Sequence, residues 1–517
     1  MGMWRLGIVC FFGLMLGARH LVAERINQEG RILGVVPVIS QPILFNTPEA
    51  DAVVSAMQVM PRDSAWNEDV SKRPLLTNSD AMIAQIATDL GASRNTLRLF
   101  SEMNYVLVPD AQARVAINFF NYPDESDLDG GSGSTGRYPI PPNLPIETWP
   151  VGTGALTLTQ WQQDVNNTGG DRHAIMVAPG VGSIWETWLT KLATNGTWQA
   201  SNGAKFDLKT NTLRPAGWTS GDAAGLPMFP ALVRYDECER GMAEHAMRLV
   251  VKRTRVGPIY PATHQASVGN TTSANIPAMG QRLRLKSSFV IPATWSKEEK
   301  AVALGLKKYG AIVADNGGFF SISICPDDRF PSGAFSHIQT VGISNFEVVQ
   351  TTDATSGPRS AGAPIVDAGP DQNVEFGATI TLTGSITGTG TAVQWKLYSG
   401  PGTLALENAS LANTTATFSL PGNYTLMLSA DDGVHAVAYD AVVIHVTLPV
   451  SINQTGNVVS VSFPSLTGHT YRVEQSTDLV AWAILADNLS GTGNPITVPD
   501  PASSTAARAF YRVSVLQ

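Results

Sequence analysis

The chain has 517 residues, of which 43% are hydrophobic and 15% charged, and its formal net charge at pH 7 is −8. This length predicts several domains, and 47 glycines with 32 prolines favour turn-rich β structure over helical bundles. No region has the net basic character that nucleic-acid binding requires, so we expect no nucleic-acid partner.

Residues 1–23 have the pattern of a cleaved secretory signal peptide. A short basic region around Arg5 precedes an apolar run from Leu6 to Leu16, and small residues follow near Ala23. The apolar run is too short for a membrane span. The protein is therefore expected to be secreted or held at the cell surface.

Two cysteines remain after the signal peptide, Cys238 and Cys325. An oxidising compartment would allow them to pair, and the alternative is two buried thiols. The Cα separation decides between these outcomes, and the sequence does not contain it.

Two helices are predicted from their caps. Ser79 as N-cap precedes DAMIAQIATDL and Gly91, and a capping box of Ser296 and Glu299 precedes KEEKAVALGLKKY and Gly310. Most other segments of the region, such as RLRLKSSFVI, alternate apolar and polar residues.

Residues 24–350 are therefore expected to form a mainly β domain, sandwich-like or jelly-roll-like, with a few helices. Within it, side chains able to do acid–base chemistry or to bind a substrate gather from Trp218 onward. The catalytic candidates are Asp222, Asp236, Glu237, His245 and His264. The candidates for substrate binding are Trp218, Arg234, Arg282, Arg284, Lys286, Asp315 and Asn316.

The segment ALVRYDE is predicted to be a strand. Its alternation sends Arg234 and Asp236 to one face and Tyr235 and Glu237 to the other, so only one of the two adjacent carboxylates can face a given cleft. If Asp236 pairs with an arginine, Glu237 or Asp222 remains as the titrating group. The alternative is a lattice of carboxylates and arginines that braces a polar sheet face.

The segment RLRLK directs Leu283 and Leu285 into the core, with Arg282, Arg284 and Lys286 on the opposite face. Cations in such a row require nearby anions, either the carboxylates above or an acidic substrate. A solvated edge face is the alternative.

Both histidines of this region suit a general acid, a general base or a substrate hydrogen bond. His264 lies in a loop-like segment, and a structural hydrogen bond is the alternative for it and for His245. No H-x-H or HExxH spacing is present, so we predict no metal site and no cofactor. Asp315 and Asn316 end an apolar strand at a glycine turn, which suits a cleft rim or an Asx turn. Tryptophans of the front region would stack on sugars if one or two are exposed.

Residues 351–363 have the composition of a linker, and residues 364–447 resemble the PKD-like and REJ-like immunoglobulin-type modules of secreted bacterial proteins. The resemblance depends on Trp395, on Tyr424 in PGNYTLML, and on the ADDG turn ending at Gly433. It implies a β-sandwich that acts as a spacer or binding module.

Residues 448–517 resemble a C-terminal β module common in exported proteins of Verrucomicrobia-like bacteria. The shared residues are Gly468, Tyr471, Val473, Ser476, Asp478, Leu479, Trp482 and Phe510 to Val513. Tandem modules of this kind imply spacing, adhesion or sorting, and association with the cell surface is a further expectation.

The front region, from about Pro61 to Pro326, resembles a family of uncharacterised secreted bacterial proteins. The shared motifs include GDRHAIMV, WTSGDAAGLPMFPALVRYDE, MGQRLRLK and YGAIVADNG. The resemblance implies no activity. The family pattern has valine at Cys238 and alanine at Cys325, and two cysteine departures together favour a disulfide.

The function predicted from these residues is a secreted polysaccharide-acting enzyme, most simply a glycoside hydrolase. Glu237 or Asp222 would be the acid and Asp236 or Asp315 the base or nucleophile, because hydrolysis of a glycosidic bond uses two carboxyl groups. The histidines and the arginine row would hold the sugar. One alternative is a lyase that acts on an acidic glycan, with His264 or Tyr235 abstracting the proton. Another is a non-catalytic glycan-binding or adhesion protein.

Overall fold

The computed structural model describes residues 25–151, 153–266, 271–350, 363–388, 391–456, 458–504 and 508–516. The chain divides into two compact units, which we call the front unit (Arg25–Gly362) and the tail unit (from Ala363 onward). The predicted signal peptide, and the predicted linker except its last residue, lie outside the described residues. No helix within the described ranges has both the length and the apolar character needed to cross a membrane.

The fold is mainly β, as predicted. The strands of the front unit are β1 (Ile43–Leu44), β2 (Leu97–Ser101), β3 (Val106–Leu107), β4 (Val115–Phe119), β5 (Thr135–Tyr138), β6 (Ala174–Ala178), β7 (Ser183–Trp188), β8 (Lys191–Leu192), β9 (Trp198–Ala200), β10 (Asn202–Asp207), β11 (Met247–Val251), β12 (Arg282–Leu285), β13 (Ala311–Asn316), β14 (Phe320–Ile324) and β15 (Phe346–Val348).

These strands form mixed sheets that contain both parallel and antiparallel pairs. The sheet orders are β15-β12-β13-β11-β14-β2, β1-β3-β6-β7-β10 and β5-β4-β9-β8. β11 pairs parallel to β13 and antiparallel to β14, while β3 pairs parallel to β6. The sheet that contains β11 and the sheet that contains β7 carry the side chains of the site.

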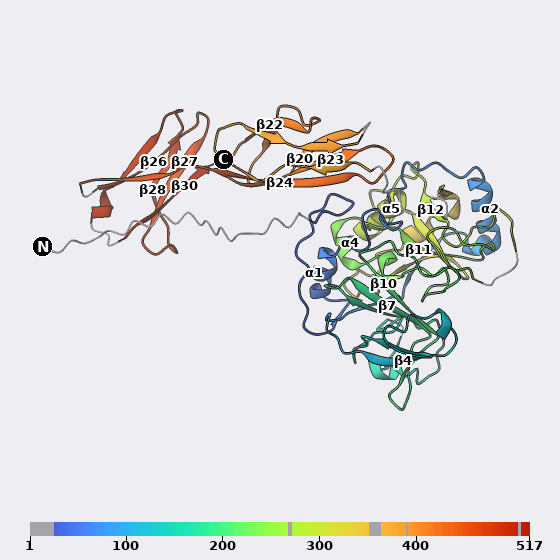
Figure 1. Ribbon diagram of the computed structural model, residues 1–517. Coiled ribbons are helices and arrows are strands. Elements are labelled where there is room, and N and C mark those ends of the chain that lie inside the picture. The colour runs from blue at the N-terminus through green and yellow to red at the C-terminus, as the bar shows by residue number, and fades with distance from the viewer. Residues whose placement is uncertain are drawn as a thin grey trace. The chain divides into compact units, whose positions relative to one another are not determined.

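The helices of the front unit are α1 (Pro48–Ala56), α2 (Ser79–Leu90), α3 (Leu158–Gln162), α4 (Tyr235–Arg240) and α5 (Lys297–Lys308). Figure 1 shows α2, α4 and α5 around β11 and β12, with the sheet of β7 and β10 between these elements and β4. Buried apolar side chains such as Val302 on α5 and Ile312 on β13 belong to one core cluster. Burial of these apolar faces stabilises the packing of the helices on the sheet.

The capping box predicted for α5 is present. The Ser296 hydroxyl accepts a hydrogen bond from the Glu299 amide at 3.0 Å, and the Glu299 carboxylate accepts one from the Ser296 amide at 3.0 Å. The predicted N-cap of α2 needs a correction, because Asn78 occupies that position and Ser79 is the first helical residue. The Ser79 hydroxyl instead accepts a hydrogen bond from the Val348 amide at 2.9 Å.

The strand predicted for ALVRYDE is wrong, because Ala231 ends a 3-10 helix, Val233 makes only an isolated bridge to Ile324, and the residues from Tyr235 onward form α4. Arg234 occupies the N-cap position, and its amide donates to the Glu237 carboxylate at 3.2 Å. Gly241, with φ at 93°, ends the helix in the left-handed conformation. Asp236 and Glu237 therefore share the first helical turn and both reach Arg234, instead of facing opposite sides of a strand.

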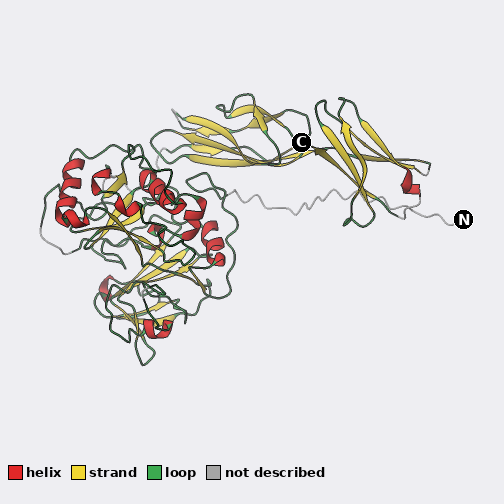
Figure 2. Ribbon diagram, turned by 180° about the vertical axis from the view of Figure 1, so that it is seen from behind, coloured by secondary structure: helices red, strands yellow, loops and turns green. Residues whose placement is uncertain are grey.

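The tail unit consists almost wholly of strands, as Figure 2 shows. They are β16 (Ile365–Asp367), β17 (Gln372–Glu375), β18 (Ile380–Thr383), β19 (Ser385–Thr387), β20 (Ala392–Ser399), β21 (Leu404–Leu406), β22 (Asn413–Phe418), β23 (Gly422–Asp431), β24 (Ala438–Thr447), β25 (Ser451–Thr455), β26 (Val458–Phe463), β27 (Thr470–Ser476), β28 (Ala483–Ser490), β29 (Ile496–Asp500) and β30 (Phe510–Leu516). The sheet β17-β24-β23-β20 carries the buried Trp395 and Tyr424.

Candidate functional site

The predicted site residues belong mainly to three groups of polar side chains in the front unit. The first surrounds Arg234 at the start of α4, the second surrounds Arg248 on β11, and the third lies along β12. The sequence led us to expect these residues in one region, whereas ion pairs join residues within the first group and within the second, and Arg284 of the third group pairs with Glu347.

In the first group, Arg234 holds both carboxylates of α4. Its Nη2 atom lies 2.8 Å from Glu237 Oε1, and its Nε atom lies 3.6 Å from Asp236 Oδ1. Asp236 also accepts a hydrogen bond from Arg240 at 2.5 Å. Nε2 of His245 lies 3.1 Å from Glu237 Oε2, and its Nδ1 lies 2.9 Å from a main-chain carbonyl oxygen.

Glu237 in this first group is only 1% exposed, although it lines a small pocket together with Arg31, Arg234 and His245. Burial alone would raise the pKa of Glu237, but the charges of Arg234 and His245 lower it to about 2. A carboxyl group with this pKa holds no proton near neutral pH, so it is unsuited to act as a general acid.

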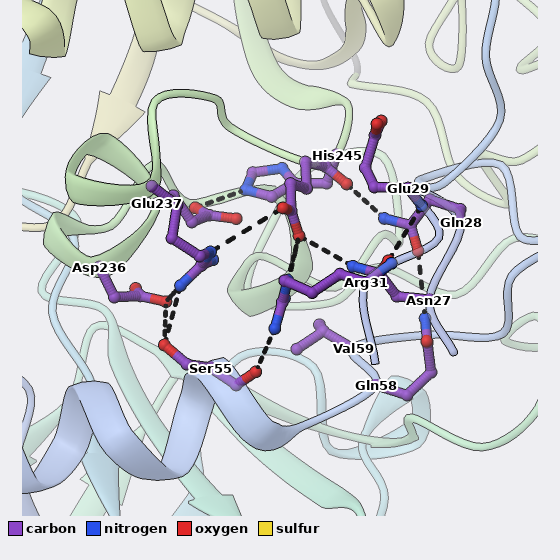
Figure 3. A network of polar contacts seen from close by, with 12 residues as sticks. Asn27, Gln28, Glu29, Arg31, Ser55, Gln58, Val59, Asp236, Glu237 and His245 are labelled. Carbon is purple, nitrogen blue, oxygen red and sulfur yellow. Dashed lines mark hydrogen bonds and ion pairs between the residues drawn. The ribbon is translucent and has the colours of Figure 1, made fainter. Parts of the chain in front are cut away.

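The N-terminal segment packs against the same group, as Figure 3 shows. Arg31 Nη2 and Asn27 Nδ2 each lie 2.9 Å from Glu244 Oε2, and Gln28 Nε2 donates to the Glu244 carbonyl at 2.5 Å. The geometry therefore gives this group the bracing role that the sequence left open as an alternative.

The arginine row on β12 also needs a correction, because β12 is buried on both faces. Arg282 donates to two main-chain carbonyl oxygens, and Arg284 donates to Glu347 at 2.7 Å. Glu347 balances the charge of Arg284, whereas the groups bonded to Arg282 are uncharged carbonyl oxygens, so the two side chains do not form a solvated cationic row. Lys286 follows the strand and is half-buried.

The second group is built on Arg248. Its Nε and Nη2 atoms donate to the two oxygens of Asp222, each at 2.9 Å, and Nη2 also donates to Asp315 at 2.8 Å. The side chains of Arg248 and Asp222 are 4% and 1% exposed, whereas that of Asp315 is 26% exposed. Asp315 thus connects the buried ion pair with the surface.

Further carboxylates approach Arg248 from other elements. Glu102 follows β2 and accepts a hydrogen bond from Ser323 at 3.4 Å, while Glu147 accepts one from the His173 amide at 3.1 Å. Asp171 is exposed and lies two residues before His173. We call this set, consisting of Glu102, Glu147, Asp171, Asp222 and Asp315 around Arg248, the acidic cluster.

Several carboxyl groups of the acidic cluster have raised pKa values. Burial and the charge of Glu102 raise the pKa of Glu147 to about 7. Burial raises the pKa of Glu102 and of Asp315, in both cases against the lowering effect of Arg248. Burial likewise raises the pKa of Asp222, although its ion pair with Arg248 favours the charged form. A partly exposed carboxyl group that titrates near pH 7, as Glu147 does, is suited to general acid catalysis.

A buried imidazole completes the group. His173 is 3% exposed, and burial lowers its pKa to about 4, so its ring is neutral near pH 7. Among the described residues its Nδ1 atom has no hydrogen-bond partner, and it would lie 3.8 Å from a Cβ atom placed on Gly221, next to Asp222. A buried polar atom without a partner is rare and indicates a place for a further polar group.

The remaining predicted residues have local partners. Nδ1 of His264 lies 2.6 Å from the Ala223 carbonyl oxygen, and Asn316 donates to Thr254 at 3.3 Å. The Trp218 ring lies 5.4 Å from the Arg214 guanidinium carbon, in a cation–π contact. Cys238 and Cys325 are free and buried, so the predicted disulfide between them is absent.

An aromatic pair, of which Tyr122 is exposed and Trp188 half-buried, adjoins the acidic cluster. Trp188, at the end of β7, stacks on Tyr122 with ring centroids 6.2 Å apart and an interplanar angle of 29°. Nε1 of Trp188 donates to Asp171 at 3.3 Å. Tyr122 is 41% exposed, and the neighbouring Phe120 is 49% exposed.

The sequence pattern predicted Asp222 and Asp315 as site residues, but not Arg248, Glu102 or Glu147. It also did not predict that the segment GDRHAIMV contributes Asp171 and His173 to the site. Arg248 lies in AMRLVV, where an arginine at an inward-facing strand position is the signal that was available. The two glutamates lie far from the chemistry-rich segment, and no local pattern links them to it. Among the described residues, no group of His, Cys, Asp and Glu has the geometry of a metal site.

Comparisons with known proteins identify one module. Residues 368–446 match a family model for a PKD domain. The solution structure of the PKD domain from KIAA 1837 protein is 28% identical and covers 16% of this chain and 84% of its own, with a TM-score of 0.15. No curated protein matches the chain.

Other solved structures show weaker likeness. The D00-D0 domain of intimin is 10% identical over 30% of this chain and 93% of its own, with a TM-score of 0.16. A nucleoside hydrolase-related hypothetical protein from Saccharophagus degradans is 14% identical over 34% of this chain and 41% of its own, also with a TM-score of 0.16. The PKD domain is typical of extracellular proteins and fits a glycan-binding or adhesion role.

Proposed function

We propose that the chain, whose PKD domain follows the front unit in the sequence, is a secreted polysaccharide-acting enzyme, most simply a glycoside hydrolase. The observation that carries the proposal is Glu147, a mostly buried carboxyl group whose pKa the charge of Glu102 helps to raise to about 7, while the partly exposed Asp315 pairs with Arg248 in the same cluster. Hydrolysis of a glycosidic bond uses one protonated and one ionised carboxyl group. The acidic cluster contains candidates for both.

In this proposal Glu147 is the general acid that protonates the leaving oxygen. Asp315 is the second carboxyl group, because it lies 2.8 Å from the Arg248 guanidinium and its side chain is 26% exposed. Glu102 is a positioning residue whose charge helps to raise the pKa of Glu147. The first-group residues Asp236, Glu237 and His245 are not assigned to catalysis, because all three are buried in the ion-pair network around Arg234.

Replacing Glu147 with glutamine is expected to lower the rate of sugar release from polysaccharides by about 10²–10⁴-fold, the usual contribution of a general acid. Release of reducing ends from a panel of neutral and acidic polysaccharides measures it. The matched control is Glu49→Gln, the same change at an exposed position in the first turn of α1. Equal rates for wild type and Glu147→Gln would remove the assignment.

The pH profile gives an independent test. Only protonated Glu147 can donate, so kcat/KM is expected to fall as the pH rises above about 7. The charged groups that act on Glu147 are Glu102, Asp171, Arg172 and Arg248. Because the charge of Glu102 raises the pKa of Glu147, Glu102→Gln should move this descending limb to lower pH. If the descending limb of the pH profile is the same in Glu102→Gln as in the wild type, Glu102 does not raise the pKa of Glu147.

The second candidate function is a non-catalytic glycan-binding or adhesion protein, favoured by the PKD domain at residues 368–446. Retention of the intact chain on immobilised polysaccharide, with no reducing ends released, would favour it over hydrolysis. A lyase has less support, because Arg282 and Arg284 are buried and already paired. Release of unsaturated products that absorb ultraviolet light would favour a lyase over a hydrolase. Attachment at the cell surface through the tail unit belongs to the same proposal.

A further inference from the structure

The aromatic pair of Tyr122 and Trp188 reaches the surface, with Tyr122 exposed and Trp188 half-buried, although large aromatic rings are usually buried. Tyr122 is 41% exposed, and it follows β4 in a run with Phe120 and Asn121, which are also exposed. The main chain fixes the pair, since the Tyr122 amide donates to the Ser201 carbonyl at 3.0 Å and the Ser201 amide donates to the Trp188 carbonyl at 2.6 Å. The rings are therefore held in position without a bound ligand.

A hydrogen bond connects this pair with the acidic cluster. Trp188 Nε1 donates to Asp171, and the charge of Asp171 contributes to the raised pKa values of Glu102 and Glu147. Asp171 lies two residues before His173, whose amide donates to Glu147 at 3.1 Å, so the aromatic pair and the proposed general acid are parts of one region.

The composition of the region selects the kind of ligand. An aromatic ring offers its face to C–H groups, and the Asn121 amide beside it can donate and accept hydrogen bonds. The exposed carboxylate of Asp171 accepts a hydrogen bond from Trp188 Nε1, so a negatively charged ligand beside this ring would be repelled. A flat, uncharged ring with several hydroxyl groups meets both conditions.

From these contacts we infer that Tyr122 and Trp188 form a subsite that binds an uncharged sugar unit of a polysaccharide next to Glu147. The inference rests on the proposed function for its placement beside the general acid. Binding of a sugar requires no turnover, so an experiment can contradict the subsite without contradicting the proposed hydrolysis, and the reverse. The subsite makes neutral polysaccharides the substrate class and disfavours uronate-containing ones.

The test is affinity electrophoresis of the intact chain in gels that contain hydroxyethyl cellulose, barley β-glucan, galactomannan or polygalacturonate. We expect retention by at least one of the three neutral polymers and none by polygalacturonate. Trp188→Ala and Tyr122→Ala should each weaken the retaining interaction by about tenfold, whereas Trp188→Phe should keep most of it because the flat apolar face remains. Unchanged melting temperatures would show that the variants are folded.

The matched control is Tyr398→Ala, which removes an aromatic ring of similar exposure (43%) from the tail unit. Its retention should equal that of the wild type. Retention only by polygalacturonate, no retention by any neutral polymer, or loss of retention in Tyr398→Ala but not in Trp188→Ala would overturn the subsite. Wild-type retention that depends on Trp188, with no sugar released, would support the subsite and overturn hydrolysis alone.

Discussion

Replacing Arg248 with methionine is expected to destabilise the front unit by about 3–5 kcal/mol, the usual cost of removing one partner from a buried ion pair. Asp222 would keep its burial, with a side chain 1% exposed, but would lose both of its 2.9 Å hydrogen bonds to the guanidinium. Methionine has a similar length, so the loss arises from the uncompensated carboxylate more than from a cavity. Urea unfolding followed by tryptophan fluorescence measures the change.

The control is the double variant Arg248→Met with Asp222→Asn, which removes the stranded charge. It should recover part of the lost stability, because a neutral amide costs less to bury than a carboxylate. The prediction would be contradicted if Arg248→Met were as stable as the wild type. It would also be contradicted if the double variant were no more stable than Arg248→Met. Because Asp222 is uncharged when protonated, the deficit of the single variant should also shrink at low pH.

The second large effect is expected in the tail unit, where Trp395→Ala should cost about 3–5 kcal/mol. Trp395 is 1% exposed, and its indole nitrogen donates to the Ala412 carbonyl at 3.0 Å. Its Cζ2 atom would lie 3.1 Å from a Cβ atom added at Gly384, which shows how closely the indole is packed. The truncation leaves a cavity between the sheets and one carbonyl without its donor. Thermal unfolding of the intact chain should show earlier loss of the tail-unit transition.

Trp482→Ala is the matched control for this second prediction, because it removes the same side chain from the same unit. Trp482 is only partly buried, and its ring contacts the Arg512 guanidinium at 4.4 Å. An exposed cation–π contact contributes about 0.5–1 kcal/mol, so the expected shift is much smaller. Equal shifts for the two variants would contradict the central position of Trp395. Sugar release by the front unit should be unaffected in both.

The elements predicted correctly depend on short-range patterns. Ser296 and Glu299 lie three residues apart, and the capping box they form needs no other part of the chain. The PKD module was likewise identified from residues within one segment, and the family match at residues 368–446 agrees. The start of α4 was missed, although Glu237 three residues after Arg234 is a helix-start signal, because the alternation in ALVRYDE was given more weight.

The amino-acid sequence by itself determined the mainly β character of the chain, the caps of α5 and the PKD module, because backbone preferences and hydrogen bonds within a few residues decide these. Only the tertiary structure decided which charges meet. Asp222, Arg248 and Asp315 lie on a loop, β11 and β13, and Glu102 and Glu147 approach from elsewhere. Their contacts arise from sheet pairing between distant segments. Burial then sets their pKa values, since the cost of desolvating a carboxylate depends on everything packed around it.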